Sequence, residues 1–92
     1  MSALRKALPQ AVRELRIFGC QSSPASEGVR AFIRSSYPSI KSANPHLPIL
    51  IREAQGTPAR GFVRFERGVE KQVSLDGASS AEEVEKRIAG LL

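Results

Sequence analysis

Reactive side chains are scarce in this sequence. Its 92 residues include one cysteine, one histidine and no tryptophan. A single cysteine excludes a disulfide within the chain and a four-cysteine zinc site, and with a single histidine no ordinary closed structural zinc centre can form. No apolar run approaches the roughly 20 residues that cross a bilayer. We therefore expect one small soluble or peripheral domain, without metal and without direct membrane insertion.

Acidic residues are few in the first half of the chain. The net charge is +5, and residues 1–46 hold seven basic and two acidic side chains, whereas residues 47–92 hold seven of each. The whole excess of positive charge therefore lies before residue 47. Such asymmetry indicates an acidic partner, which is a protein surface, a nucleic acid or an anionic membrane. The basic residues are scattered singly, which argues against a dedicated nucleic-acid tail.

The first residues form a basic segment of their own. No acid occurs before Glu14, and Leu4, Leu8 and Val12 recur at helical spacing. This composition is that of a mitochondrial targeting segment, although it is short and contains Pro9. We expect residues 1–12 to be a basic arm, either a retained import signal or a flexible segment. Residues 13–92 are expected to form the domain.

A strand followed by a helix opens the domain. Glu14–Gly19 alternates as a strand should, with Leu15 and Ile17 on one face and Phe18 on the other, which indicates that both faces are at least partly covered. A helix is expected from Ser23-Pro24, because serine caps a helix and proline suits its first turn. It ends or kinks before Pro38. The apolar stripe of this helix is Val29, Phe32, Ile33, Tyr37 and Ile40.

Three further strands are expected. The apolar run Pro48–Ile51 is typical of a strand that is covered on both faces and pairs in parallel with the first strand. Gly61–Glu66 and Val69–Leu75 flank Arg67-Gly68 and predict a hairpin. Strand, helix and strand within about 40 residues indicate a right-handed crossover unit.

The closing helix carries the clearest start signal. A capping box is formed either by Ser79 with Glu82 or by Ser80 with Glu83. Val84, Ile88 and Leu91 line its inner face, while Glu82, Glu83 and Glu85 are accounted for by helix electrostatics. The order β-α-β-β-β-α, with helices packed on a four-stranded mixed sheet, predicts an α/β fold of the thioredoxin-like type.

Cys20 lies where the first strand meets the first helix, which is where thiol–disulfide oxidoreductases hold their attacking sulfur. A helix N-terminus favours the thiolate there. The second cysteine position of a C-x-x-C motif holds Ser23, so no thiol resolves a mixed disulfide. Pro58 stands where thioredoxin-like proteins place a cis-proline, and both a cis and an ordinary trans proline fit the sequence. We interpret Cys20, Ser23 and Pro58 as vestigial positions, with Cys20 an inert side chain.

Several stretches together resemble one known family. They are Leu15-Arg-Ile17, Cys20-Gln21, Ser23-Pro24, Gly28-Val29-Arg30, Phe32-Ile33 and, most specifically, Ala43-Asn-Pro-His-Leu-Pro-Ile-Leu-Ile-Arg-Glu53. The sequence is similar to the small thioredoxin-fold accessory subunit of mitochondrial NADH:ubiquinone oxidoreductase (complex I), alpha subcomplex subunit 2. The resemblance covers nearly all of residues 12–92. The same domain type occurs in some mitochondrial ribosomal proteins.

The resemblance implies a non-catalytic subunit without a cofactor. It implies a peripheral position on the matrix side of the mitochondrial inner membrane. It also implies contact with the large iron–sulfur subunit and support for assembly of the module that oxidises NADH. Some family members carry a second cysteine directly after the Ile-Arg-Glu sequence, where this chain has Ala54. The substitution removes any disulfide switch with Cys20.

A scaffold subunit depends on shape and charge. We expect Arg30 and Arg34 on the outer helix face, with Arg13 and Arg16, to contact carboxylates of a partner. Two alternatives remain open. The positive first half fits a mitochondrial ribosomal protein that binds RNA, and Cys20 at a helix start fits a monothiol enzyme of the glutaredoxin type. The resemblance favours the complex I subunit and no contact with nucleic acid.

Overall fold

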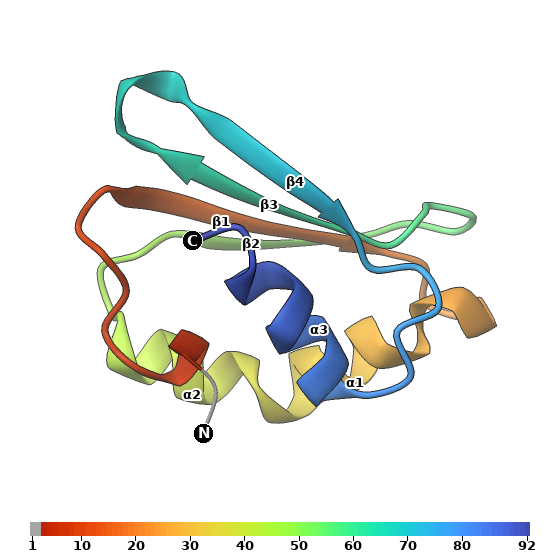
Figure 1. Ribbon diagram of the computed structural model, residues 1–92. Helices are drawn as coiled ribbons and strands as arrows, with labels where there is room; N and C mark the ends of the chain where they lie inside the picture. The colour runs from red at the N-terminus through yellow and green to blue at the C-terminus, as the bar shows by residue number, and fades with distance from the viewer. Residues whose placement is uncertain (1–2) are drawn as a thin grey trace.

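Three α-helices cover one face of a four-stranded mixed sheet in this structure, a computed structural model that describes residues 3–92 (Figure 1). The strand order is β2-β1-β3-β4, with β2 parallel to β1 and β3 antiparallel to both β1 and β4. The strands are β1 (Val12–Gly19), β2 (Ile49–Glu53), β3 (Arg60–Phe65) and β4 (Glu70–Ser74). The helices are α1 (Glu27–Ser35), α2 (Tyr37–Ala43) and α3 (Ala81–Ala89). The predicted α/β fold of the thioredoxin-like type is confirmed.

The predicted start and break of the first helix are both confirmed. Ser23 Oγ accepts a hydrogen bond from the backbone N–H of Ala25 at 3.3 Å and caps a 3₁₀ turn, Pro24–Ser26, that leads into α1. The helix ends at Ser35, and α2 begins with Tyr37-Pro38. A proline in the first turn of α2 loses no hydrogen bond, because the first N–H groups of a helix have no partner inside it.

The hairpin and the closing helix form where local signals place them. Arg67 and Gly68 adopt φ angles of 66° and 75° between β3 and β4, and glycine reaches this left-handed region without strain. At the start of α3, Ser80 Oγ accepts from the backbone N–H of Glu83 at 3.1 Å. Of the two expected capping pairs, Ser80 with Glu83 is therefore the one used.

The hydrophobic core lies between the sheet and the helices. Leu15 and Ile17 of β1 point into it, each 1% exposed. Across from them, Phe32 of α1 and Ile88 of α3 are fully buried. The remaining buried apolar residues that join this core are Leu4, Val12, Val29, Ile40, Ala59, Val63, Leu75, Ala78 and Val84. These buried residues therefore form one continuous hydrophobic core, and residues 3–92 contain no second one.

The expectation that β2 is covered on both faces is wrong, whereas Phe18 on the second face of β1 is half-buried, in line with the partial cover expected there. Within residues 3–92 all three α-helices lie on the same side of the sheet (Figure 1). β2 is an edge strand, and Leu50 on its uncovered face is only half-buried. A short apolar run does not distinguish a central strand from an edge strand, because both are apolar wherever they pack. The uncovered face is therefore a property that only the tertiary structure shows.

The N-terminal segment packs on the domain instead of projecting from it. Leu4, in the short 3₁₀ turn Ala3–Arg5, is fully buried. The side-chain amide of Asn44 accepts from the backbone N–H of Leu8 at 2.9 Å and donates to the carbonyl of Lys6 at 3.0 Å. This part of the arm therefore contributes to the core, while its role as an import signal stays a prediction. No helix among residues 3–92 is long and apolar enough to span a membrane.

Candidate functional site

Cys20 follows β1 and is only 3% exposed. Its Sγ accepts a hydrogen bond from the backbone N–H of Gly56 at 3.3 Å, and Ser22 Oγ lies 3.8 Å away. Backbone N–H groups of Ser22, Gly56 and Ser23, in that order, lower the pKa of Cys20 from 9.0 to about 7. These groups stabilise the thiolate, because an anion gains more than a neutral thiol from N–H donors. The sulfur is thus electronically activated although it is almost closed to solvent.

Polar side chains near Cys20 form hydrogen bonds with backbone atoms of the same segment. Arg30 Nη1 donates to the carbonyl oxygens of Cys20 and Ser23 at 3.0 and 2.8 Å. Ser26 Oγ accepts from the backbone N–H of Cys20 at 3.0 Å. In residues 3–92 no group of three histidine, cysteine, aspartate or glutamate side chains is placed to hold a metal ion. The junction therefore holds one thiol and a set of structural hydrogen bonds.

Pro58 adopts the trans form, since no peptide bond in residues 3–92 is cis. It is exposed, in a loop that turns back through a hydrogen bond from the N–H of Thr57 to the carbonyl of Ala54 at 3.1 Å. Gly56 in the same loop, with a φ of +78°, is the residue that approaches the sulfur. Of the two forms that fit the sequence, the ordinary trans loop proline is the one observed.

The four arginines expected to contact a partner do not share one surface. Arg13 lies exposed at the start of β1 and pairs with Glu66 at 3.2 Å. Arg16 lies on the uncovered face of the sheet, between Glu14 at 3.1 Å and Glu70. Arg34 is exposed on α1. Because Arg30 is engaged by backbone carbonyls, Arg34 is the more accessible of the two helix arginines.

A buried ion pair is the main feature that the sequence did not indicate. Glu85 of α3 is 2% exposed, and Arg5 donates to its two carboxylate oxygens from Nε at 3.2 Å and from Nη2 at 2.9 Å. Ser36 Oγ donates to Glu85 Oε2 at 2.5 Å. The Glu85 carboxylate also raises the pKa of Arg5. Helix electrostatics alone therefore does not account for Glu85, which lies beside Val84 on the inner side of α3.

Gly28 is a second residue whose role only packing shows. Its backbone N–H donates to the carbonyl of Ala78 at 3.1 Å, and a Cβ at this position would lie 2.4 Å from that same oxygen. The start of α1 and the segment before α3 therefore meet backbone to backbone, which a side chain at residue 28 would prevent.

Comparison with known proteins connects this arrangement to one family. The family model for the mitochondrial ribosomal protein L51 / S25 / CI-B8 domain matches residues 29–80. A protein of Arabidopsis thaliana named NADH dehydrogenase (ubiquinone) 1 alpha subcomplex subunit 2 is 48% identical, over 82% of this chain and 77% of its own. The protein of the same name from Mus musculus is 44% identical, over 88% of this chain and 81% of its own. This chain belongs to the alpha subcomplex subunit 2 family.

A relative from Neurospora crassa matches over an even larger part of the chain. The NADH-ubiquinone oxidoreductase 10.5 kDa subunit of Neurospora crassa is 39% identical, over 96% of this chain and 93% of its own. The resemblance found in the sequence is thereby confirmed. The matched domain runs from α1 to the cap of α3, so it contains Pro58 and leaves Cys20 and Ser23 outside.

Proposed function

We propose that this protein is an accessory subunit of mitochondrial NADH:ubiquinone oxidoreductase, complex I, and that it acts by binding and not by catalysis. The observation that carries the proposal is identity of 39–48% over most of the chain to proteins named as subunits of this enzyme. A role in the mitochondrial ribosome is not favoured, because these relatives bear the names of NADH dehydrogenase subunits although the domain type includes ribosomal proteins.

The site chemistry supports a binding role. A dithiol mechanism needs a second sulfur, and the chain has Ser23 and Ala54 at the two positions considered for one. A monothiol mechanism needs access, and Cys20 is 3% exposed beneath the loop that carries Gly56. We further propose a peripheral position on the matrix side of the inner membrane, in contact with the large iron–sulfur subunit of the NADH-oxidising module.

Deletion of the gene for this chain tests the proposal. Native gels of mitochondria without it should show less assembled complex I, or complex I without its NADH-oxidising module, and reduced NADH-oxidising activity. Wild-type chain should restore the complex. Unchanged amount, composition and turnover of complex I in the deletion strain would refute the proposed function.

The lowered pKa of Cys20 favours a monothiol enzyme as the second candidate function. The variant Cys20→Ser separates this function from the role as a subunit. Cys20→Ser should restore complex I as well as wild type does, and the purified wild-type chain should reduce glutathione mixed disulfides no faster than this variant. A variant that fails to restore the complex, together with thiol-dependent turnover by the wild type, would support the enzyme instead.

A further inference from the structure

Three apolar side chains gather around Arg16 on the face of the sheet opposite the helices. Leu15 and Ile17 point toward the helices, so the alternate positions of β1 and their cross-strand neighbours point the other way. These neighbours place Phe62 of β3 and Leu50 of β2 on either side of Arg16, and Phe18 lies next along β1. The rings of Phe18 and Phe62 meet edge to face with centroids 5.4 Å apart. All three apolar side chains are half-buried and, within residues 3–92, no helix covers them.

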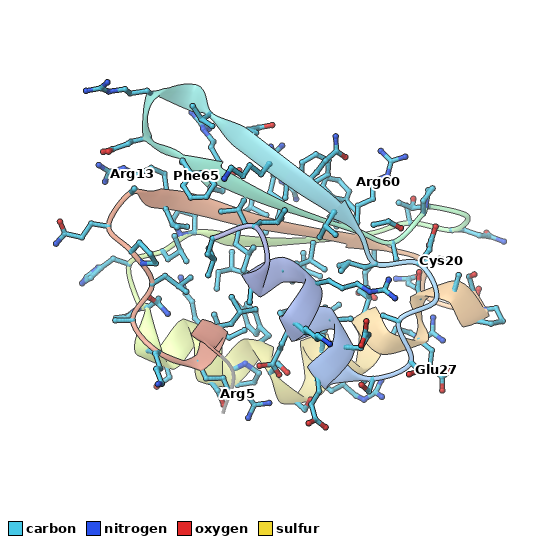
Figure 2. The ribbon with its side chains drawn as sticks, viewed as in Figure 1. Arg5, Arg13, Cys20, Glu27, Arg60 and Phe65 are labelled. Carbon is cyan, nitrogen blue, oxygen red and sulfur yellow. The ribbon has the colours of Figure 1, made fainter. Side chains whose placement is uncertain are left out.

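Three exposed arginines that form no ion pair among residues 3–92 lie around these apolar side chains. Arg52 and Arg60 flank Phe18 on the two neighbouring strands, and Arg64 lies opposite Glu14. Each of the three is exposed, and none forms an ion pair among the described residues. Figure 2 shows Arg60 projecting from the sheet on the side away from the helices.

The carboxylates of the same face are already engaged. Glu14 lies 3.1 Å from Arg16 Nε, and Glu70 is hydrogen-bonded to Nη2 of the same guanidinium. The single positive charge of Arg16 balances only one of these two carboxylates, so the four arginines on the strands of this face (Arg16, Arg52, Arg60 and Arg64) exceed its two glutamates by two charges. The face keeps an excess of positive charge around an apolar patch.

We propose that this face docks an acidic amphipathic helix of a protein partner. Apolar side chains of that helix would lie on Phe18, Phe62 and Leu50, and carboxylates on both sides of its apolar stripe would pair with the three free arginines. Strands lie about 4.8 Å apart and a helix with side chains is about 10 Å wide, so one helix covers roughly three strands. The helix supplies the layer that an apolar sheet face ordinarily requires. The docking of an acidic helix on this face does not depend on the proposed function. Only the identification of the partner's assembly as complex I rests on that function.

Ring geometry favours a protein over RNA as the occupant. Proteins that bind single-stranded RNA on a sheet stack bases on the open faces of aromatic rings. Here the guanidinium of Arg16 lies over the Phe62 ring, with Cζ 5.1 Å from the centroid, and the Phe18 ring meets Phe62 edge to face. A base would have to displace Arg16 from both carboxylates before it could stack on Phe62. Apolar side chains of a helix require no such displacement.

A peptide titration tests the docking face independently of complex I. The probe is a synthetic helix of roughly 18 residues with leucines on one face and flanking glutamates, and a lysine-flanked version of it is the control. In ¹H–¹⁵N NMR spectra of the full chain, we expect the acidic probe to shift amides of β1, β2 and β3 near Phe18 and Phe62, and the basic probe to shift none. Shifts centred on the helices, equal effects of both probes, or no shift at millimolar acidic probe would overturn the proposal.

Charge reversal in cells tests the same face in the assembly. The variant R52E/R60E/R64E lowers the net charge by six, from +5 to −1, and K6E/K71E/K86E does the same with exposed basic residues away from this face. The sheet variant should co-migrate with complex I at least about tenfold less than wild type, and the control should be retained. Replacement of the same three arginines by lysine should preserve co-migration. Thermal unfolding of the purified chains checks that the variants fold.

The outcomes separate the two proposals. If wild type does not co-migrate with complex I, the proposed function is wrong and the peptide titration still decides the docking face. If wild type co-migrates and both charge variants do so equally, or only the control is lost, the docking face is wrong and the proposed function stands. Co-sedimentation of the wild type with ribosomal particles, abolished by R52E/R60E/R64E, would assign the face to RNA and overturn the protein partner.

Discussion

Replacing Arg5 with methionine removes the guanidinium that neutralises a buried carboxylate. Glu85 is 2% exposed, and Arg5 holds both of its oxygens with contacts of 3.2 and 2.9 Å. Methionine keeps much of the aliphatic length of arginine, so the change tests the charge more than the packing. The variant therefore leaves a negative charge in a site from which water is largely excluded.

The expected loss of stability is about 2–4 kcal/mol. Breaking a fully buried ion pair costs about 3–5 kcal/mol, because the remaining charge stays desolvated. We take a lower range because 34% of the Arg5 side chain is exposed, which lets water reach the site. For a domain of this size the melting temperature should fall by roughly 10–20 °C. Chemical unfolding in urea, followed by circular dichroism, measures the free energy directly.

Arg13→Met is the matched control. Arg13 pairs with Glu66, and their side chains are 59% and 54% exposed, so this variant should lose less than about 1 kcal/mol. The double variant R5M/E85M should recover much of the loss, because neither charge then remains buried. If R5M and R13M lose the same small amount, or if R5M/E85M is no more stable than R5M, the assigned role of the pair is wrong.

Three further variants test other contacts. Gly28→Ala should destabilise the fold by about 2 kcal/mol or more, since its Cβ would lie 2.4 Å from the Ala78 carbonyl oxygen, while Gly90→Ala, with no contact under 3.4 Å, should cost little. Asn44→Ala should cost about 1–3 kcal/mol and accelerate amide hydrogen exchange in the N-terminal segment, because Asn44 holds that backbone. Cys20 has a pKa of about 7 in the folded chain against 9.0 ordinarily, so its thiolate adds stability above pH 9 that is lost as the pH falls through 7. Urea unfolding at pH 6 and pH 9 should show this pH dependence in wild type and not in Cys20→Ser.

Local signals in the sequence were sufficient for most of the secondary structure. The alternation along β1, the serine cap of α3 and the break at Pro38 each depend on residues a few positions apart, and each appears where it was predicted. Boundaries moved by one or two residues, as in β1, which begins at Val12 and not at Glu14. Such features are predictable because neighbours in the chain decide them.

The candidate site was less predictable than the fold. The sequence located the Cys20 junction and the missing second thiol, because both follow from residue identity. It did not show that Gly56 donates to the sulfur, or that Arg30 binds the backbone carbonyl of Cys20. These contacts join segments that are brought together only when the strands pair.

The sequence by itself determined the order of elements, the family and the absence of a resolving thiol in this protein. The tertiary structure alone decided which sheet face stays open, and it brought Arg5 to Glu85 across 80 positions of the chain. There is a physical reason why the sequence determined some features and only the tertiary structure decided the others. Caps, turns and alternation are interactions between near neighbours, whereas burial and the pairing of charges depend on which distant segments come into contact.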